Sequence, residues 1–223
     1  MNAANAMSAG SKRRHPRAGL NGARLLVLTD RRGCQAVGNE LVDTVRVVAE
    51  AGAPFVVFRE KDLERPARWS LAEQIQTALT DTPTGLLIAS DVELAGHLGA
   101  DGVHLAASDP TPERNPTQPA VFGRSCHSYD DAAAADDVDY VTVSPFALTA
   151  SKPGYGPALG TDAIANIAKG TEVPVFALGG INDTNAAQAL DAGAAGVAVM
   201  GAVMRAGDPA AAVDALLRQT ESR

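Results

Sequence analysis

Charged side chains recur where short apolar runs of the sequence end. Arg59 and Lys61 follow one such run, and Lys152 lies in a long loop after another. Asp91 and Asp109 follow two further runs. Cations and two carboxylates at one place suit a polyphosphate carried by Mg²⁺, because Mg²⁺ takes oxygen ligands from one or two carboxylates and from the substrate's phosphates. The sequence therefore predicts a magnesium-assisted site for a phosphorylated small molecule.

Glycines after the last two apolar runs are suited to a second phosphate. Gly179 and Gly180 follow one run, and Gly201 follows the other. Backbone N–H groups at such turns bind phosphate without any side chain. The expected site therefore has a cationic part and a glycine-rich part.

Each of the charged residues also has a simpler structural interpretation. Asp91 could cap a helix, and Asp109 could cap a turn. Lys61 could be a solvated loop charge, whereas the long loop around Lys152 favours a functional role for that residue.

Three residues near the fourth and fifth runs are open to a structural interpretation as well. Ser125 could be only a small residue at the end of a strand. We interpret His104 as a hydrogen-bonded core residue rather than a catalyst. We interpret Cys126 as a small buried hydrophobe rather than a nucleophile, because no lowered thiol pKa can be inferred from the sequence.

The elements that must position these residues are short, Val-rich apolar runs separated by longer amphipathic segments. This alternation is typical of parallel strands joined by helices, and runs without a polar alternation indicate strands buried on both faces. The runs cover residues 25–28, 55–58, 85–89, 102–105, 121–123, 140–143, 175–178 and 196–199. Eight such units predict a single closed (β/α)₈ TIM barrel, in which the functional residues lie at the carboxyl ends of the strands.

Helix boundaries are marked by capping residues and glycines. Ser128 with Asp131 forms a capping-box pattern, Thr111 and Asp208 each precede a proline, and Asn182 is expected to open another helix.

Three joints between a helix and the next strand share one pattern. Gly52, Gly99 and Gly193 each stand between a predicted helix and a predicted strand, where glycine supplies a left-handed cap. A doubly wound open sheet is the alternative, but no glycine-rich dinucleotide loop follows the first run.

The composition limits the function classes to which the chain can belong. It has 223 residues, 46% of them hydrophobic, and a formal net charge of -7. No run of about 18 apolar residues occurs, so we expect no membrane span. Nucleic-acid binding needs clustered Lys and Arg, which are found only at residues 12–17. The two cysteines cannot form a disulfide framework and lack metal-finger spacing, so we expect a cytoplasmic protein.

The N-terminal residues differ from the rest of the chain. Residues 1–22 have no apolar core after their basic cluster, so they are not a secretory signal and are expected to form a disordered extension. Residues 23–223 are expected to form one catalytic barrel domain. The sequence leaves open whether the protein is a homo-oligomer.

Several segments, in this order and spacing, together resemble the thiamine-phosphate synthase and TenI family. They are FREKDL (58–63), SDVELAGHLGADGVHLAASD (90–109), GRSCHS (123–128), DYVTVSPFALTASKPG (139–154), VFALGGI (175–181) and GAAGVAVMGAV (193–203). The resemblance implies a (β/α)₈ fold and a transferase of thiamine biosynthesis. Such an enzyme joins the diphosphate of an amino-hydroxymethylpyrimidine to a thiazole that carries a phosphoethyl group, and it releases pyrophosphate.

The resemblance also implies residue roles. Asp91 and Asp109 would hold Mg²⁺, directly or through water. The pyrimidine diphosphate would be bound by Arg59, Ser90 and the catalytic residues Lys61, Ser125 and Lys152, with Lys152 on the leaving group. The thiazole phosphate would be bound by Thr149, Ser151, Gly180, Met200 and Gly201.

The sequence departs from the family's pattern at several positions, and two of the changes, at 57 and 90, remove side chains that would contact the pyrimidine ring. Val57 stands where Gln is usual, Ser90 where Asn is usual, and Ala106–Ala107 where Gly-Gln is usual. Gly201 also replaces a Ser. An unpaired ring nitrogen in a buried site would cost about 1–3 kcal/mol, so these changes concern substrate identity more than reaction type.

Two other functions are compatible with the resemblance. A TenI-like thiazole tautomerase would use His127 for proton transfer, since an imidazole titrates near neutral pH. A barrel that binds a phosphorylated ligand without catalysis is the other alternative. The two acids favour the synthase, because a tautomerase has no diphosphate to neutralise.

Overall fold

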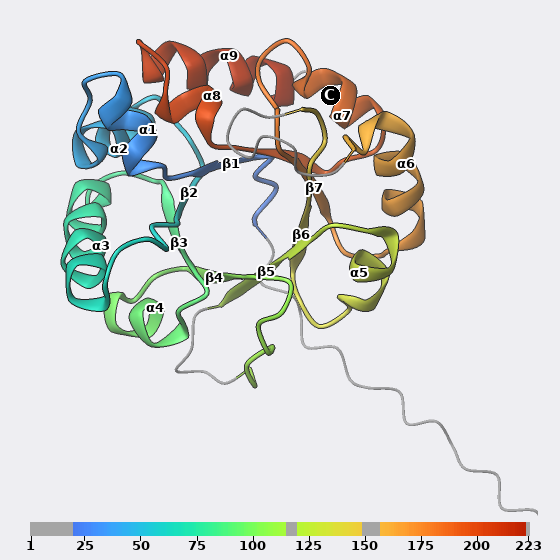
Figure 1. Ribbon diagram of the computed structural model, residues 1–223, viewed down its shortest axis with the longest axis horizontal. Coiled ribbons are helices and arrows are strands. Elements are labelled where there is room, and N and C mark those ends of the chain that lie inside the picture. Colours follow the sequence, from blue (N-terminus) through green and yellow to red (C-terminus); the bar gives the residue numbers. More distant parts are fainter. Residues whose placement is uncertain (1–19, 115–119, 149–156, 222–223) are drawn as a thin grey trace, which may run out of the picture.

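Eight parallel strands form a closed barrel. The computed structural model describes residues 20–114, 120–148 and 157–221. Its strands are hydrogen-bonded in sequence order from β1 to β8, and the helices surround them (Figure 1). Pairing of β1 with β8, in which Leu26 lies opposite Ala198, closes the sheet. The predicted TIM barrel is confirmed, and the open doubly wound sheet is excluded.

The strands coincide with the predicted apolar runs except at one place. Their bounds are β1 Leu25–Leu28, β2 Phe55–Phe58, β3 Gly85–Ala89, β4 Gly102–Leu105, β5 Val121–Cys126, β6 Tyr140–Val143, β7 Val175–Leu178 and β8 Gly196–Val199. Strand β5 is three residues longer than the predicted 121–123. Arg124 and Ser125 interrupt the apolar run, yet Ser125 pairs with Thr142 of β6 and Arg124 with Leu105 of β4.

The helices form the outer layer of the barrel. Their bounds are α1 Arg31–Ala36, α2 Leu41–Glu50, α3 Arg65–Leu79, α4 Val92–Leu98, α5 Tyr129–Ala134, α6 Gly160–Gly170, α7 Ala186–Asp191, α8 Gly201–Met204 and α9 Pro209–Glu221. Two of the predicted starts are confirmed. The Ser128 side chain accepts a hydrogen bond from the Asp131 amide at 3.1 Å, and Asp208 Oδ1 accepts one from the Ala211 amide at 3.0 Å.

Two predicted helix starts are wrong, and each has a local cause. Asn182 does not open α7, which begins only at Ala186. The Asn182 Oδ1 atom instead accepts a hydrogen bond from the Thr184 amide at 2.9 Å, and the chain forms a turn there. Thr111 opens no helix within the described residues 111–114. Its hydroxyl instead accepts a hydrogen bond from the guanidinium of Arg124.

The glycine joints between helices and strands have the predicted left-handed backbone. The φ angles are +87° at Gly52, +63° at Gly99 and +100° at Gly193. Glycine adopts this conformation without the steric penalty that a Cβ atom would bring. The chain can therefore leave each helix and enter the next strand within a few residues.

Two apolar cores hold the barrel together. The larger one lies between the strands and the surrounding helices, and the smaller one fills the barrel interior. Tyr140, Phe176, Leu87 and Val57 belong to the interior core and are at most 1% exposed. Leu20 also packs there at 7% exposure, within the part of the expected N-terminal extension that the structure describes. The rest of that extension, residues 1–19, lies outside the described residues.

Two sequence expectations about environment can be compared with the structure. In the described part of the chain, no helix is both long enough and apolar enough to cross a membrane. Cys34 and Cys126 are free and buried. Burial raises the pKa of the Cys126 thiol to about 11, which confirms its interpretation as a small buried hydrophobe.

We expect Gly123→Ala to destabilise the barrel strongly, because a Cβ atom at this position would overlap the ring of the buried Tyr140. The expected loss is about 1–3 kcal/mol of unfolding free energy, as for other overpacked cores. Gly96→Ala is the matched control, since no atom lies within 4 Å of its Cβ position in α4. That variant should gain about 0.5–1 kcal/mol from helix propensity. Urea denaturation of both variants measures the difference, and equal stabilities would contradict this packing.

Candidate functional site

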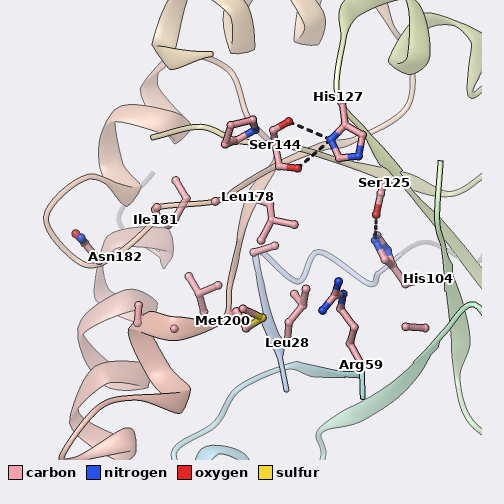
Figure 2. A pocket seen from close by; sticks show the side chains of 18 of the residues that line it. Leu28, Arg59, His104, Ser125, His127, Ser144, Leu178, Ile181, Asn182 and Met200 are labelled. Atoms are coloured by element: carbon pink, nitrogen blue, oxygen red, sulfur yellow. Dashed lines mark hydrogen bonds between the residues drawn. The ribbon is translucent and has the colours of Figure 1, made fainter. Parts of the chain in front are cut away.

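A cavity of about 630 Å³ opens at the carboxyl ends of the strands. Figure 2 shows Leu28, Leu178, Ile181 and Met200 around one part of it, with Arg59, Ser125 and His104 around another. The predicted site residues that line it are Arg59, Lys61, Ser125, His127, Gly180, Met200 and Gly201. Residues from β2, β5, β7 and β8 are thus brought together, as expected for chemistry at this end of a TIM barrel.

The other predicted site residues lie elsewhere. Ser90, Asp91 and Asp109 are described but do not line the cavity. Thr149, Ser151 and Lys152 lie outside the described residues.

Local hydrogen bonds hold the chain at Arg59 and Glu60, at the end of β2. The buried hydroxyl of Thr29 accepts a hydrogen bond from the Arg59 amide at 2.8 Å. Glu60 is 4% exposed and does not line the cavity; its Oε1 accepts a hydrogen bond from the Arg31 amide at 3.1 Å. Burial raises the pKa of this carboxyl. Arg59 and Lys61, on either side of Glu60, both line the cavity, which gives its rim a positive charge.

Asp91 has the structural role that its sequence position also suggested. Its Oδ1 accepts a hydrogen bond from the Leu94 amide at 2.9 Å and caps α4, and its Oδ2 lies 3.3 Å from a guanidinium nitrogen of Arg68. Both carboxylate oxygens therefore have protein partners, and the side chain is 18% exposed.

Asp109 is tied to the cationic rim. Burial alone would raise its pKa, but hydrogen bonds from the Ser90 hydroxyl and the Ala106 amide, together with the charges of Lys61 and Arg124, lower the pKa below its usual value. The hydrogen bond from the Ala106 amide to Asp109 Oδ2 is 2.7 Å long. Asp109 is therefore an anion at neutral pH, close enough to Lys61 to respond to its charge.

The glycine-rich part of the cavity depends on backbone conformation. Gly179 and Gly180 have φ angles of +92° and +69°. A Cβ atom at Gly180 would collide with the carbonyl oxygens of Ala147 and Leu148, so only glycine fits there. The Asn185 amide group donates a hydrogen bond to the Gly180 carbonyl at 2.8 Å and fixes this turn.

Arg124 is a positioning residue that the sequence reasoning missed. Its guanidinium donates to the carbonyl oxygens of Ala106, Ala107 and Asp109 at 3.2, 3.2 and 2.7 Å. It therefore holds the loop after β4, which carries the Asp109 carboxylate. An arginine within the otherwise uncharged segment 121–126 was the available sequence signal.

Arg205 was missed as well. It lines the cavity from the residue after α8 and lies 2.9 Å from Asp30 Oδ2. Its separation of four residues from Gly201 places both on one side of a helical turn, which was the only sequence signal.

The two histidines of the cavity differ in environment. His104 is 5% exposed, and burial together with the charges of Lys61 and Arg59 lowers its pKa to about 3. Its predicted role as a hydrogen-bonded core residue is confirmed by contacts to Tyr140 and Ser125. His127 Nδ1 lies 3.2 Å from the Ser144 carbonyl oxygen (Figure 2). The Ser144 hydroxyl oxygen lies 3.3 Å from the same nitrogen, so Nδ1 can donate to the carbonyl or accept from the hydroxyl, depending on the tautomer.

Ser90 is expected to be conformationally strained, because its φ angle is +57°. Ser90→Ala and Ser90→Gly both lose the hydrogen bond to Asp109, but only glycine relieves the strain. Ser90→Gly should therefore be more stable than Ser90→Ala by about 1 kcal/mol in urea denaturation. Ser90→Asn, which tolerates the left-handed region, should be at least as stable as the unchanged protein. Equal stability of the alanine and glycine variants would argue against strain at this position.

Comparison with known proteins agrees with this arrangement. The profile of a family described as thiamine monophosphate synthase matches residues 25–203. A putative thiamine-phosphate synthase of Geobacter sulfurreducens is 38% identical over 203 residues, which cover 86% of this chain and 92% of that protein. The bifunctional protein ThiM/ThiE of Symbiobacterium thermophilum is 38% identical over 180 residues, which cover 78% of this chain but 38% of that longer protein.

A solved structure has the same barrel. The thiamine phosphate pyrophosphorylase of Pyrococcus furiosus superposes with a TM-score of 0.78 and 28% identity, over 91% of this chain and 98% of that one. The family match over residues 25–203 contains every strand of the barrel and every residue that lines the cavity except Arg205. The chain therefore belongs to the thiamine monophosphate synthase family.

Proposed function

We propose that this protein is a thiamine-phosphate synthase, a transferase that joins a pyrimidine diphosphate to a thiazole phosphate and releases pyrophosphate. One observation carries the proposal. Arg59, Lys61 and Ser125 line the same cavity as the glycine turn at Gly180 and the chain at Gly201. A cationic rim for a diphosphate and a backbone site for a monophosphate are what two phosphorylated substrates require.

The electrostatics of the rim suit a departing diphosphate. When the bond between the pyrimidine methylene carbon and the diphosphate oxygen breaks, negative charge grows on the diphosphate and positive charge on the methylene. Arg59 and Lys61 stabilise the first of these charges, and prearranged cations do so without reorganisation. The thiazole nitrogen then donates its electron pair to the methylene carbon and forms the new bond. The protein's work is thus to hold both partners and to stabilise the leaving group.

The acidic residues are compatible with a Mg²⁺ ion that arrives with the diphosphate. Within the described residues, no group of three or more His, Cys, Asp or Glu side chains could hold a metal ion. Two carboxylates, at Asp91 and Asp109, match the smaller number that Mg²⁺ takes when substrate phosphates supply further oxygens. Because Asp91 is ion-paired with Arg68, a cation that competes with Mg²⁺, we propose that Asp109 is the more direct ligand and that Asp91 acts through water. When bound, Mg²⁺ would neutralise charge on the leaving group.

The proposal assigns roles to three residues of the loop after β6 from the family resemblance alone. Lys152 would bind the leaving group, and Thr149 and Ser151 would bind the thiazole phosphate. Ser144, Pro145 and Leu148, from the described start of the same loop, line the cavity, which supports these assignments.

The pyrimidine side of the cavity is more apolar than the family pattern implies. Val57, which replaces the usual Gln, is 1% exposed and packs in the barrel interior with Leu26 and Leu28. It does not line the cavity and offers no hydrogen bond to a ring nitrogen. We therefore propose that recognition of the pyrimidine depends more on its diphosphate than on its ring.

A thiazole tautomerase is the second candidate, and the environment of His127 favours it. In the tautomer in which Nδ1 donates to the Ser144 carbonyl oxygen, Nε2 has the lone pair that a base requires. Such an enzyme would convert the thiazole phosphate alone, without the pyrimidine or Mg²⁺. A barrel that only binds phosphorylated ligands would show neither reaction.

Both cysteines are free and buried, so we also propose a reducing, cytoplasmic location. We propose small phosphorylated molecules as the partners of this site, whether the protein is a monomer or a homo-oligomer.

We expect purified protein, incubated with both phosphorylated substrates and Mg²⁺, to form thiamine phosphate, detected by mass spectrometry. Lys61→Ala should lower kcat about 100-fold, because it removes a cation from the developing diphosphate. Lys169→Ala is the matched control: the residue is exposed in the last turn of α6 and outside the cavity. No product from the unchanged protein, or conversion of the thiazole phosphate alone, would reject the synthase.

We expect the two acidic residues to differ in their effect on metal dependence. Asp109→Asn should raise the Mg²⁺ concentration for half-maximal activity by about 10- to 100-fold, as loss of a metal-site carboxylate does elsewhere. Asp91→Ala should act less on Mg²⁺ and more on stability, since it removes the cap of α4, which costs about 1 kcal/mol. Titration of activity with Mg²⁺ and urea denaturation separate these effects. An unchanged Mg²⁺ requirement in Asp109→Asn would contradict its assignment.

A further inference from the structure

Three side chains from adjacent strands form a hydrogen-bonded chain beneath the cationic rim. The Tyr140 hydroxyl of β6 lies 2.9 Å from His104 Nδ1 of β4. His104 Nε2 lies 2.9 Å from Ser125 Oγ of β5, a contact drawn in Figure 2. His104 and Ser125 line the cavity, whereas Tyr140 is fully buried below it. The chain therefore connects the barrel interior to the substrate side.

Packing holds the rings of Tyr140 and His104 in place. Tyr140 is 0% exposed and meets Phe176 edge-on, with ring centroids 5.5 Å apart. Its ring also lies against Gly123, where any Cβ atom would overlap it. The His104 ring is stacked near the same tyrosine, with centroids 5.5 Å apart and planes inclined by 26°. Neither ring has space for another orientation without repacking the interior core.

The imidazole of His104 is neutral. Burial and the nearby cations Lys61, Arg59 and Arg124 all disfavour a positive charge, and they outweigh the opposite effect of Asp109. A neutral imidazole carries one hydrogen, on either Nδ1 or Nε2, and the other nitrogen can only accept.

Hydrogen-bond accounting distinguishes the two forms. Among the described residues, His104 is the hydrogen-bond partner of the Tyr140 hydroxyl. If Nδ1 carried the hydrogen, the buried Tyr140 O–H would have no acceptor, and such a group costs about 1–3 kcal/mol. If Nε2 carries it, Tyr140 donates to Nδ1 and Nε2 donates to Ser125. Thr142 Oγ1, 3.4 Å from Nε2, is a longer and weaker contact in either form.

We propose that Tyr140 and His104 are positioning residues that orient the Ser125 hydroxyl as a hydrogen-bond donor toward the cavity. Because Nε2–H occupies a lone pair of Ser125 Oγ, this hydroxyl cannot donate to His104, and its hydrogen is directed to a ligand. Ser125 then offers its O–H to a ligand atom that accepts, such as an anionic phosphate oxygen. The identity of that ligand as a diphosphate rests on the proposed function, whereas the orientation does not.

The protonation of His104 can be measured directly. In protein labelled with ¹⁵N-histidine, we expect two-bond ¹H–¹⁵N correlation spectra at neutral pH to show protonated Nε2 and unprotonated Nδ1 for His104. The signals are assigned by substituting the other histidines one at a time. A protonated Nδ1, or an imidazolium, in the unchanged protein would overturn the proposal without reference to any activity.

Two variants test which residue sets the arrangement. Tyr140→Phe keeps the ring but removes the donor to Nδ1, so His104 should lose its preference for the Nε2–H form. Ser125→Ala leaves Tyr140 in place and should keep that preference. If Tyr140→Phe retains the Nε2–H form, Tyr140 does not set it. If Tyr140→Phe does not fold, the spectra of the unchanged protein and of Ser125→Ala still decide the proposal.

Binding of inorganic pyrophosphate with Mg²⁺ tests the consequence for the ligand. Tyr140→Phe should bind it about fivefold more weakly, the equivalent of one ordinary hydrogen bond. Tyr129→Phe is the matched control, because this tyrosine is 49% exposed on α5 and does not line the cavity. Equal affinity of the two variants would overturn the role assigned to Tyr140. Intact pyrophosphate binding without thiamine phosphate formation would reject the proposed function and leave this inference standing.

Discussion

Closure of the parallel barrel is the constraint on which the site depends. Because all eight strands run in one direction and β1 pairs with β8, every strand ends at the same rim. Residues as distant in sequence as Arg59 and Gly201 therefore line one cavity. Without the β1–β8 pairing, the cations after β2 and the glycine turns after β7 and β8 would lie along an open sheet. They could not then contact the same pair of substrates.

The rim combines exposed charge with a buried, neutral support. Arg59 and Lys61 supply positive charge on a protein that is acidic overall. The same cations help to keep His104 uncharged, so the layer below the rim contributes hydrogen bonds rather than charge. Arg124 uses its own charge on backbone carbonyls and thereby fixes the loop that carries Asp109. The cations that face the ligand, Arg59 and Lys61, are thus different residues from Arg124, which holds the loop.

Much of the fold could be predicted from the sequence because strands buried on both faces leave uninterrupted apolar runs. Strand β5 was predicted too short because Arg124 and Ser125 break its run, although their backbones continue the sheet. The start of α7 was misplaced because Asn182 forms a local turn instead of a cap. Arg124 and Ser125 are thus held by neighbouring strands, whereas Asn182 is held by an amide two residues along the chain.

The site could be predicted only in part, for a related reason. Residues at strand ends, such as Arg59, Lys61 and Ser125, can be located once the strands are known. Contacts between strands cannot, since no local pattern shows that Tyr140 reaches His104 or that Arg124 binds the loop after β4.

A crystal structure of the protein with Mg²⁺ and pyrophosphate tests the central claim most directly, because it locates the leaving group. The account predicts that pyrophosphate oxygens contact Arg59, Lys61 and Ser125, with Mg²⁺ between the pyrophosphate and Asp109. Pyrophosphate bound at another place, with these side chains uncontacted, would contradict it.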